Sequence, residues 1–217
     1  MAGEPQAEAA APTRWKKVKA TRTGDLGLPP ETAEDMLGEA HDALAEAPPE
    51  AVITRLARTE DQAATAVRLL AFALPKREAV WWACLASRAD IAADPKPTRP
   101  ADTACLEAAE AWVYKPVEER RLTCYRAALA SKTDRPASLA ALAAAFSSGS
   151  LAPPDSPPEV QAIPPDDSLT AQIVGNAVVM AAVRTDPAQA SRHLARLLDQ
   201  GCDIARGGNG ALESSPA

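Results

Sequence analysis

Prolines divide this chain into segments of helical length, and their positions constrain the fold more than any other feature. The sequence holds 20 prolines, and many of them stand directly before an apolar segment rich in alanine and leucine. A proline fits the first turn of an α-helix, but in the interior it removes a hydrogen bond and clashes with the preceding turn. Within the segments the apolar residues recur at helical spacing. The prolines therefore mark the starts of helices.

The composition between the prolines predicts an all-α fold. Hydrophobic residues make up 47% of the sequence but aromatic residues only 4%, so alanine and leucine, which lose little entropy in a helix, supply most of the apolar surface. Strand-forming residues never alternate with polar ones over a convincing stretch. We expect about nine helical segments in an irregular bundle of paired helices. Similar junctions at Pro75 and Pro116, about forty residues apart, are also compatible with HEAT- or armadillo-like repeats.

Changes in composition predict one helical domain with flexible ends. Tails and linkers are recognised by the lack of a periodic apolar face and by clusters of glycine, proline and serine. Gly201 is expected to end the last helix in a left-handed conformation. The predicted parts are a disordered basic tail (1–28), a helical domain (29–146), a Pro-rich extended connector (147–167), a C-terminal helix pair packed on the same domain (168–204) and a disordered tail (205–217).

Charge and cysteine usage restrict the location and the partners of the protein. The formal net charge of −6 disfavours nucleic acid, which is bound through a basic face. No stretch approaches the ~18 apolar residues that suggest a membrane span, and the chain starts without the pattern of a signal peptide. The four cysteines have no Cys-x-x-Cys spacing and resemble core residues in a reducing compartment. We expect a cytoplasmic protein with no membrane insertion.

The sequence lacks the usual arrangements of catalytic and metal-binding residues. His41 and His193, its two histidines, have no partner at metal-ligand spacing. There is no Gly-x-Ser-x-Gly motif, and the glycine-rich run at 207–210 lacks the lysine of a phosphate-binding loop. We predict no catalytic residues, no metal site and no cofactor, with a Cys/His dyad assembled from distant elements as the alternative.

The segment from Leu74 to Leu85 is the strongest candidate for a binding surface. Adjacent helical residues point about 100° apart, so Trp81 and Trp82 cannot share one face, and one ring can meet a groove or a partner. The cations Lys76 and Arg77 oppose the dipole at the start of their helix, which predicts an acidic neighbour within the protein or outside it. The alternative is that both tryptophans are buried between helix layers.

We take Arg77, Trp81, Trp82 and Trp112 as the partner-binding residues, because tryptophan and arginine dominate the energetic centres of interfaces. A second candidate is the basic cluster at 14–19, which includes Trp15. It is either part of a solvated tail or a docking segment anchored by this tryptophan.

The run Leu-Pro-Lys-Arg-Glu-Ala-Val-Trp-Trp-Ala-Cys at 74–84 resembles the signature of a family of uncharacterised bacterial all-helical proteins. That family is associated with gene neighbourhoods of the type VI secretion apparatus. The resemblance extends from Ala40 to about Ile204 and brings no catalytic residues with it. It implies a bacterial cytoplasmic accessory protein with an adaptor or assembly role.

Together these features favour a non-enzymatic helical adaptor that binds a protein partner, as an accessory or assembly factor of a bacterial secretion system. The alternative is an enzyme or small-molecule-binding protein with a pocket between the Trp-bearing helices. A pocket lined by these aromatics, with Arg77 or Glu78 pointing into it, would favour the alternative, whereas a flat or convex patch would favour the adaptor. The sequence leaves the partner and the oligomeric state open.

Overall fold

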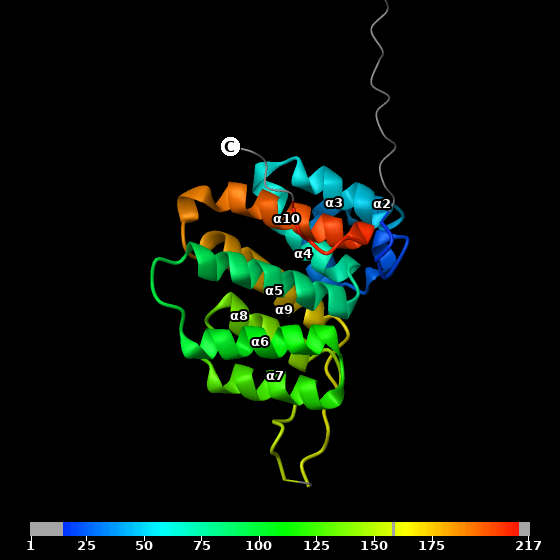
Figure 1. Cartoon of the computed structure of the whole chain (residues 1–217). Helices are drawn as coiled ribbons and strands as arrows, with labels where there is room; N and C mark the ends of the chain where they lie inside the picture. The colour runs from blue at the N-terminus through cyan, green and yellow to red at the C-terminus, as the bar shows by residue number, and fades with distance from the viewer. Residues whose placement is uncertain (1–14, 158, 213–217) are drawn as a thin grey trace, which may run out of the picture.

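The structure, a computed structural model, describes residues 15–157 and 159–212 (Figure 1). In these residues it contains ten α-helices, four short 3-10 helices and no strand, so the predicted all-α class is confirmed. The α-helices are α1 (Pro30–Leu37), α2 (His41–Ala45), α3 (Pro49–Ala57), α4 (Ala63–Ala73), α5 (Lys76–Ala93), α6 (Pro100–Tyr114), α7 (Glu118–Ala130), α8 (Pro136–Ala145), α9 (Leu169–Val183) and α10 (Ala190–Arg206). No helix in this part of the chain is long and apolar enough to cross a membrane.

Four of the ten α-helices begin with a proline, as the sequence predicts. Helices α1, α3, α6 and α8 each carry a proline in the first turn, where its fixed backbone angle suits the helix. Pro75 stands directly before α5 with an extended backbone, so α4 and α5 are separated by a sharp turn.

Helices α8 and α9 form the centre of the bundle (Figure 1). Helix α9 packs against α4, α5, α8 and α10, and α8 packs against α5, α6 and α7. A linear solenoid would pack each repeat only against its neighbours in sequence. Because α9 inserts between helices from the first half of the chain, the arrangement is an irregular bundle and not a HEAT- or armadillo-like repeat.

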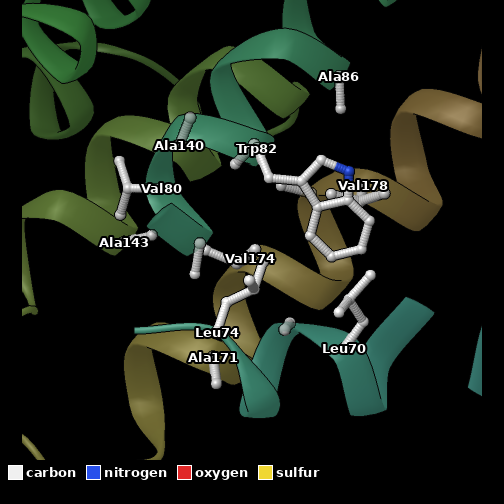
Figure 2. Packing of buried hydrophobic residues seen from close by; sticks show 14 of the residues in the cluster. Leu70, Leu74, Val80, Trp82, Ala86, Ala140, Ala143, Ala171, Val174 and Val178 are labelled. Atoms are coloured by element: carbon white, nitrogen blue, oxygen red, sulfur yellow. The ribbon is translucent and has the colours of Figure 1, made fainter. Parts of the chain in front are cut away.

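The core is rich in alanine, and the largest fully buried side chain in it is Trp82. Its indole lies beside Leu70 of α4 and Val178 of α9 (Figure 2), and the residue is 0% exposed. The indole Nε1 donates a hydrogen bond of 2.7 Å to the carbonyl oxygen of Leu197 in α10. Trp82 thus connects three layers of the bundle.

Residues 15–28 are not a flexible tail, in contrast to the prediction. Trp15 is only 6% exposed, and the backbone N–H groups of Lys16 and Lys17 both donate to the carbonyl oxygen of Ala205 at 2.8 Å. This segment lies beside the C-terminal end of α10 (Figure 1). The buried side chains of Trp15 and Leu26 and a few backbone hydrogen bonds hold this segment, whose regular structure is one short 3-10 helix, Thr23–Leu26. The remainder of the predicted tail, residues 1–14, lies outside the described residues.

The last helix is longer than predicted. Helix α10 continues through Gly201 to Arg206, and Gly207, with a φ of 107°, supplies the left-handed end. Beyond it the chain is still held, because the backbone N–H of Gly210 donates to the Asp203 carboxylate at 2.8 Å. The predicted disordered tail from 205 is therefore wrong for residues 205–212, and residues 213–217 lie outside the described part.

The Pro-rich segment 147–167 is a loop closed at its base and not an extended connector. The backbone N–H of Leu151 donates to the carbonyl oxygen of Ile163 at 2.8 Å. The hydroxyl of Tyr125 in α7 donates to the carbonyl oxygen of Leu151 at 2.6 Å, and Arg126 forms an ion pair with Asp155 at 2.9 Å. Side chains of α7 thus fix a segment whose own composition predicts no fixed structure.

Candidate functional site

A groove opens to solvent between α5, the end of α6 and the C-terminal segment that follows α10. Its cavity has a volume of about 440 Å³, and we call it the α5–α6 groove. The residues that line it are Lys17, Arg77, Glu78, Trp81, Glu110, Val113, Tyr114, Ile204, Gly208 and Asn209.

Helix geometry brings the aromatic and cationic side chains of the groove together. Arg77 and Trp81 are four residues apart on α5, so their side chains emerge from one face about one turn apart. The last turn of α6 supplies Val113 and Tyr114 on the opposite side. Tyr114 is 81% exposed, which leaves its ring available at the edge of the groove.

Trp81 is the partly exposed member of the tryptophan pair. Its indole Nε1 donates to the carbonyl oxygen of Asn209 at 2.8 Å, so the C-terminal segment covers one edge of the ring. Trp82 points about 100° away around the helix and is fully buried. The prediction that the two rings cannot share a face is confirmed.

Two guanidinium groups contact the C-terminal end of α6. Arg77 donates from Nε to the carbonyl oxygen of Val113 at 2.6 Å. Arg120 donates to the carbonyl oxygen of Ala111, and its guanidinium lies 5.9 Å from the centre of the Tyr114 ring. Cations stabilise the negative end of a helix dipole and satisfy its last carbonyl groups. Arg77 therefore contacts the partly negative end of a helix, and no carboxylate pairs with it among the described residues.

Lys76 has a carboxylate as its acidic neighbour. Its Nζ lies 2.9 Å from the Asp167 carboxylate and also donates to the carbonyl oxygen of Ser147 at 2.9 Å. Of the two cations at the start of α5, Lys76 thus has its acidic neighbour within the protein.

Each carboxylate in the groove lining already has a cationic partner. Glu78 pairs with Lys17 at 3.7 Å, and Glu110 pairs with Arg88 at 2.6 Å. Arg77 and Arg120 form no ion pair with a carboxylate among the described residues. Of these two, only Arg77 lines the groove, so the lining charge without a counter-charge among the described residues is that of Arg77.

The structure separates the four predicted partner-binding residues into two groups. Arg77 and Trp81 lie in the groove. Trp82 and Trp112 are core residues, 0% and 6% exposed, so their placement on an interaction surface is wrong for the folded chain. Helical period alone does not distinguish a tryptophan that faces the core from one that faces a groove.

Sequence reasoning did not identify Tyr114, Lys17 and Asn209 as groove residues. Tyr114 ends its helix directly before Lys115 and Pro116. An isolated aromatic residue at a helix end could have indicated an exposed binding residue. Lys17 belongs to the basic cluster at 14–19, which we named as a candidate docking segment and not as part of this groove, and Asn209 belongs to a segment that we expected to be disordered.

The four cysteines lie outside the groove lining. Among the described residues no group of three or more His, Cys, Asp or Glu side chains could hold a metal ion. The four cysteines are free. Burial raises the pKa of Cys124 to about 12 and that of Cys202 to about 11, and it also raises the pKa of Cys84. Protonated thiols are poor nucleophiles.

Fold and site together define an all-α bundle domain with a solvent-open groove lined by aromatic and charged side chains. Residues 52–205 match a family described as a family of unknown function (DUF6931), and the chain belongs to this family. No curated protein and no solved structure gave a significant match. Lys17, Gly208 and Asn209 lie outside the matched range, so terminal segments complete one side of the groove.

Proposed function

We propose that this chain is a non-enzymatic helical binding module whose α5–α6 groove takes a segment of a partner protein. The observation that supports this most is the presence of Trp81, Tyr114 and Arg77 together at an open surface. Tryptophan, tyrosine and arginine are the residue types that dominate the binding energy of protein interfaces. A solvent-open groove can accept a chain segment that covers its residues from one side.

A small-molecule site is the second candidate, because a cavity of about 440 Å³ falls within the usual range for such sites. Arg77 and Glu78 also belong to its lining, which is the feature that would favour this alternative. Small-molecule pockets, however, bury about 70–90% of the surface of their ligand. The exposed Tyr114 and the open mouth of the groove fit a protein segment better.

We further propose that the module acts in the bacterial cytoplasm as an accessory or assembly factor of a secretion system. The four free cysteines support a reducing compartment. A place in type VI secretion is supported only by the sequence resemblance at 74–84, and membership of a family of unknown function adds nothing to it.

Site-directed photo-crosslinking in the native host tests the proposed function. The photoreactive residue p-benzoyl-phenylalanine is placed at position 114 in the groove and, as a matched control, at position 129 on α7, where Leu129 is also exposed. We expect a defined protein to cross-link from position 114 and not from position 129.

The cross-linked protein is then purified, and its affinity is measured with variants of this chain. Tyr114→Ala and Arg77→Gln should each weaken binding about tenfold, equal to about 1.4 kcal/mol. Arg58→Gln removes the same charge at an exposed position outside the groove lining and should leave binding unchanged. Equal affinity for all variants would show that the groove is not the binding surface. A tightly bound small molecule displaced by these substitutions would favour the second candidate.

A further inference from the structure

We infer that the partner segment carries a carboxylate beside an apolar side chain, with the carboxylate bound by Arg77 and the apolar side chain packed against Trp81 and Tyr114. This inference rests on the proposed function and adds the chemistry of the partner to it. The charge, the hydrogen bonds and the spacing of the groove residues support it.

The charge of the groove differs from that of the chain as a whole. The chain has a formal net charge of −6, whereas the groove lining holds two cations, Lys17 and Arg77, and two carboxylates. Glu78 and Glu110 are each neutralised by a neighbouring cation. Arg77 and Arg120 form no ion pair with a carboxylate among the described residues. Of these two, Arg77 lines the groove, so an acidic segment would meet one uncompensated cation there, on a molecule whose net charge is negative.

The guanidinium of Arg77 has a fixed orientation. Its Nε is engaged by the carbonyl oxygen of Val113 at 2.6 Å, which holds the guanidinium plane at the end of α6. The terminal nitrogens of Arg77 have no acceptor among the described residues, and the side chain is exposed, so a partner can reach them. A guanidinium binds a carboxylate through two parallel hydrogen bonds, and a pre-oriented group loses less entropy on binding. Arg77 is therefore ready to receive a carboxylate.

An apolar surface lies next to this cation. The indole N–H of Trp81 is taken by Asn209, so the ring offers its carbon surface to a partner. Val113 and Tyr114 extend that surface on the α6 side. Because Arg77 and Trp81 are one helical turn apart, about 5–6 Å between their Cβ atoms, the carboxylate and the apolar side chain must also lie close together in the partner. Positions i and i+2 of an extended segment, about 6.6 Å apart, meet this requirement.

The described C-terminal segment of the chain does not cover Arg77. Asn209 of this segment contacts Trp81, and the next residue, Gly210, lies beside Leu85. A Cβ added to Gly210 would lie 2.5 Å from Leu85 Cδ1. Leu85 is one turn further along α5 than Trp81, so the segment runs away from Arg77. This end of the groove is left exposed.

A phage-displayed library of random dodecapeptides, selected on the full chain, provides the probe. Each selected peptide is synthesised in its natural form and with its acidic residue changed to the amide. Affinities are measured by fluorescence polarisation for the wild type, Arg77→Gln, Tyr114→Ala and the control Arg58→Gln. We expect the selected peptides to pair an acidic residue with an apolar one nearby, and the amide form to bind about tenfold more weakly to the wild type. Arg77→Gln should bind both forms equally, because the interaction that distinguishes them is gone.

The outcomes separate this inference from the proposed function. If Tyr114→Ala weakens binding but acid and amide peptides bind the wild type equally, the groove binds peptides and the carboxylate inference is wrong. If no selected peptide depends on Tyr114, both the inference and the proposed function fail. The comparison of acid and amide peptides uses the wild type, so it decides the question even if Arg77→Gln loosens the end of α6. Thermal melting of each variant identifies such an effect.

Discussion

Gly201 of α10 lies directly against the indole of Trp82 in α5. A Cβ at position 201 would lie 2.7 Å from Trp82 Cε2 and 2.6 Å from Leu70 Cδ2. The absence of a side chain at Gly201 lets α10 approach α5 closely enough for Leu197 to accept the Trp82 N–H. The role of this glycine is close packing in mid-helix and not helix termination.

Gly201→Ala should therefore lower the free energy of unfolding by about 1–3 kcal/mol, as overpacking of a tight core does. Intrinsic helix propensity acts in the opposite direction, because alanine is favoured over glycine by about 1 kcal/mol in a helix interior. Urea denaturation followed by circular dichroism measures the difference. A stabilised variant would contradict the close contact between Gly201 and Trp82.

The adjacent tryptophans of α5 should respond differently to truncation. Trp82→Ala removes a fully buried ring and should cost about 3–5 kcal/mol. Trp81 is only partly buried, so Trp81→Ala should cost about 1–3 kcal/mol and still yield a folded protein. Denaturation curves of both variants test this difference. Equal losses would mean that the groove face of α5 is buried in solution.

The helices could be predicted from the sequence because their signals are local. The first-turn proline of α6 and the apolar spacing that follows it depend on one segment of chain, and so does the angle between Trp81 and Trp82. The structure agrees with one of the two alternatives, since Trp82 lies in the core and Trp81 beside a groove, but it does not support Trp82 as a partner-binding residue.

Features that depend on contacts between distant segments could not be predicted. From its local sequence, Gly201 is predicted to end a helix. Its packing role depends on Trp82, which lies more than a hundred residues earlier in the chain. Lys17 and Asn209 line the groove only because residues 16–17 are held at Ala205 of α10 and Asn209 is held at Trp81 of α5. Periodicity describes the faces of regular helices and carries no information about irregular segments held by backbone hydrogen bonds.

Trp15 should be an anchor of the N-terminal segment. Trp15→Ala is expected to destabilise the protein by about 3 kcal/mol, whereas Lys16→Ala, at an exposed position, should be close to neutral. The buried indole N–H of Trp15 has no hydrogen-bond partner among the described residues, so Trp15→Phe should cost far less than Trp15→Ala. Thermal melting compares the three variants. If Trp15→Ala melts like the wild type, the segment is a tail after all.

The cysteines should be unreactive in the native protein. Burial raises the pKa of Cys124 to about 12 and that of Cys202 to about 11, so both remain protonated thiols near neutral pH. We expect slow reaction with a disulfide reagent at neutral pH and four reactive thiols after denaturation, with the half-buried Cys202 first to react in the native state. A thiol that reacts at the rate of a free cysteine would indicate an activated site.

Acid should destabilise the protein through the carboxylate of Asp94. The backbone N–H of Lys96 and the guanidinium of Arg184, at 3.0 and 2.9 Å, lower the pKa of this carboxyl below its ordinary value. A lowered folded-state pKa means that the unfolded chain binds the proton first. The stabilisation is therefore complete above the ordinary aspartate pKa of about 4 and is lost as the pH falls through the lower value of the folded state.

Urea denaturation at neutral pH and at about pH 3, below the ordinary aspartate pKa, tests this contribution. Asp94→Asn should be less stable than the wild type at neutral pH, because its amide cannot pair with Arg184, and it should lose less stability on acidification. Asp199→Asn removes an exposed carboxylate that forms no ion pair among the described residues, and it should keep the acid sensitivity of the wild type. The same acid loss in Asp94→Asn as in the wild type would assign the sensitivity to other carboxylates, such as Asp134, whose pKa is lowered by Arg99.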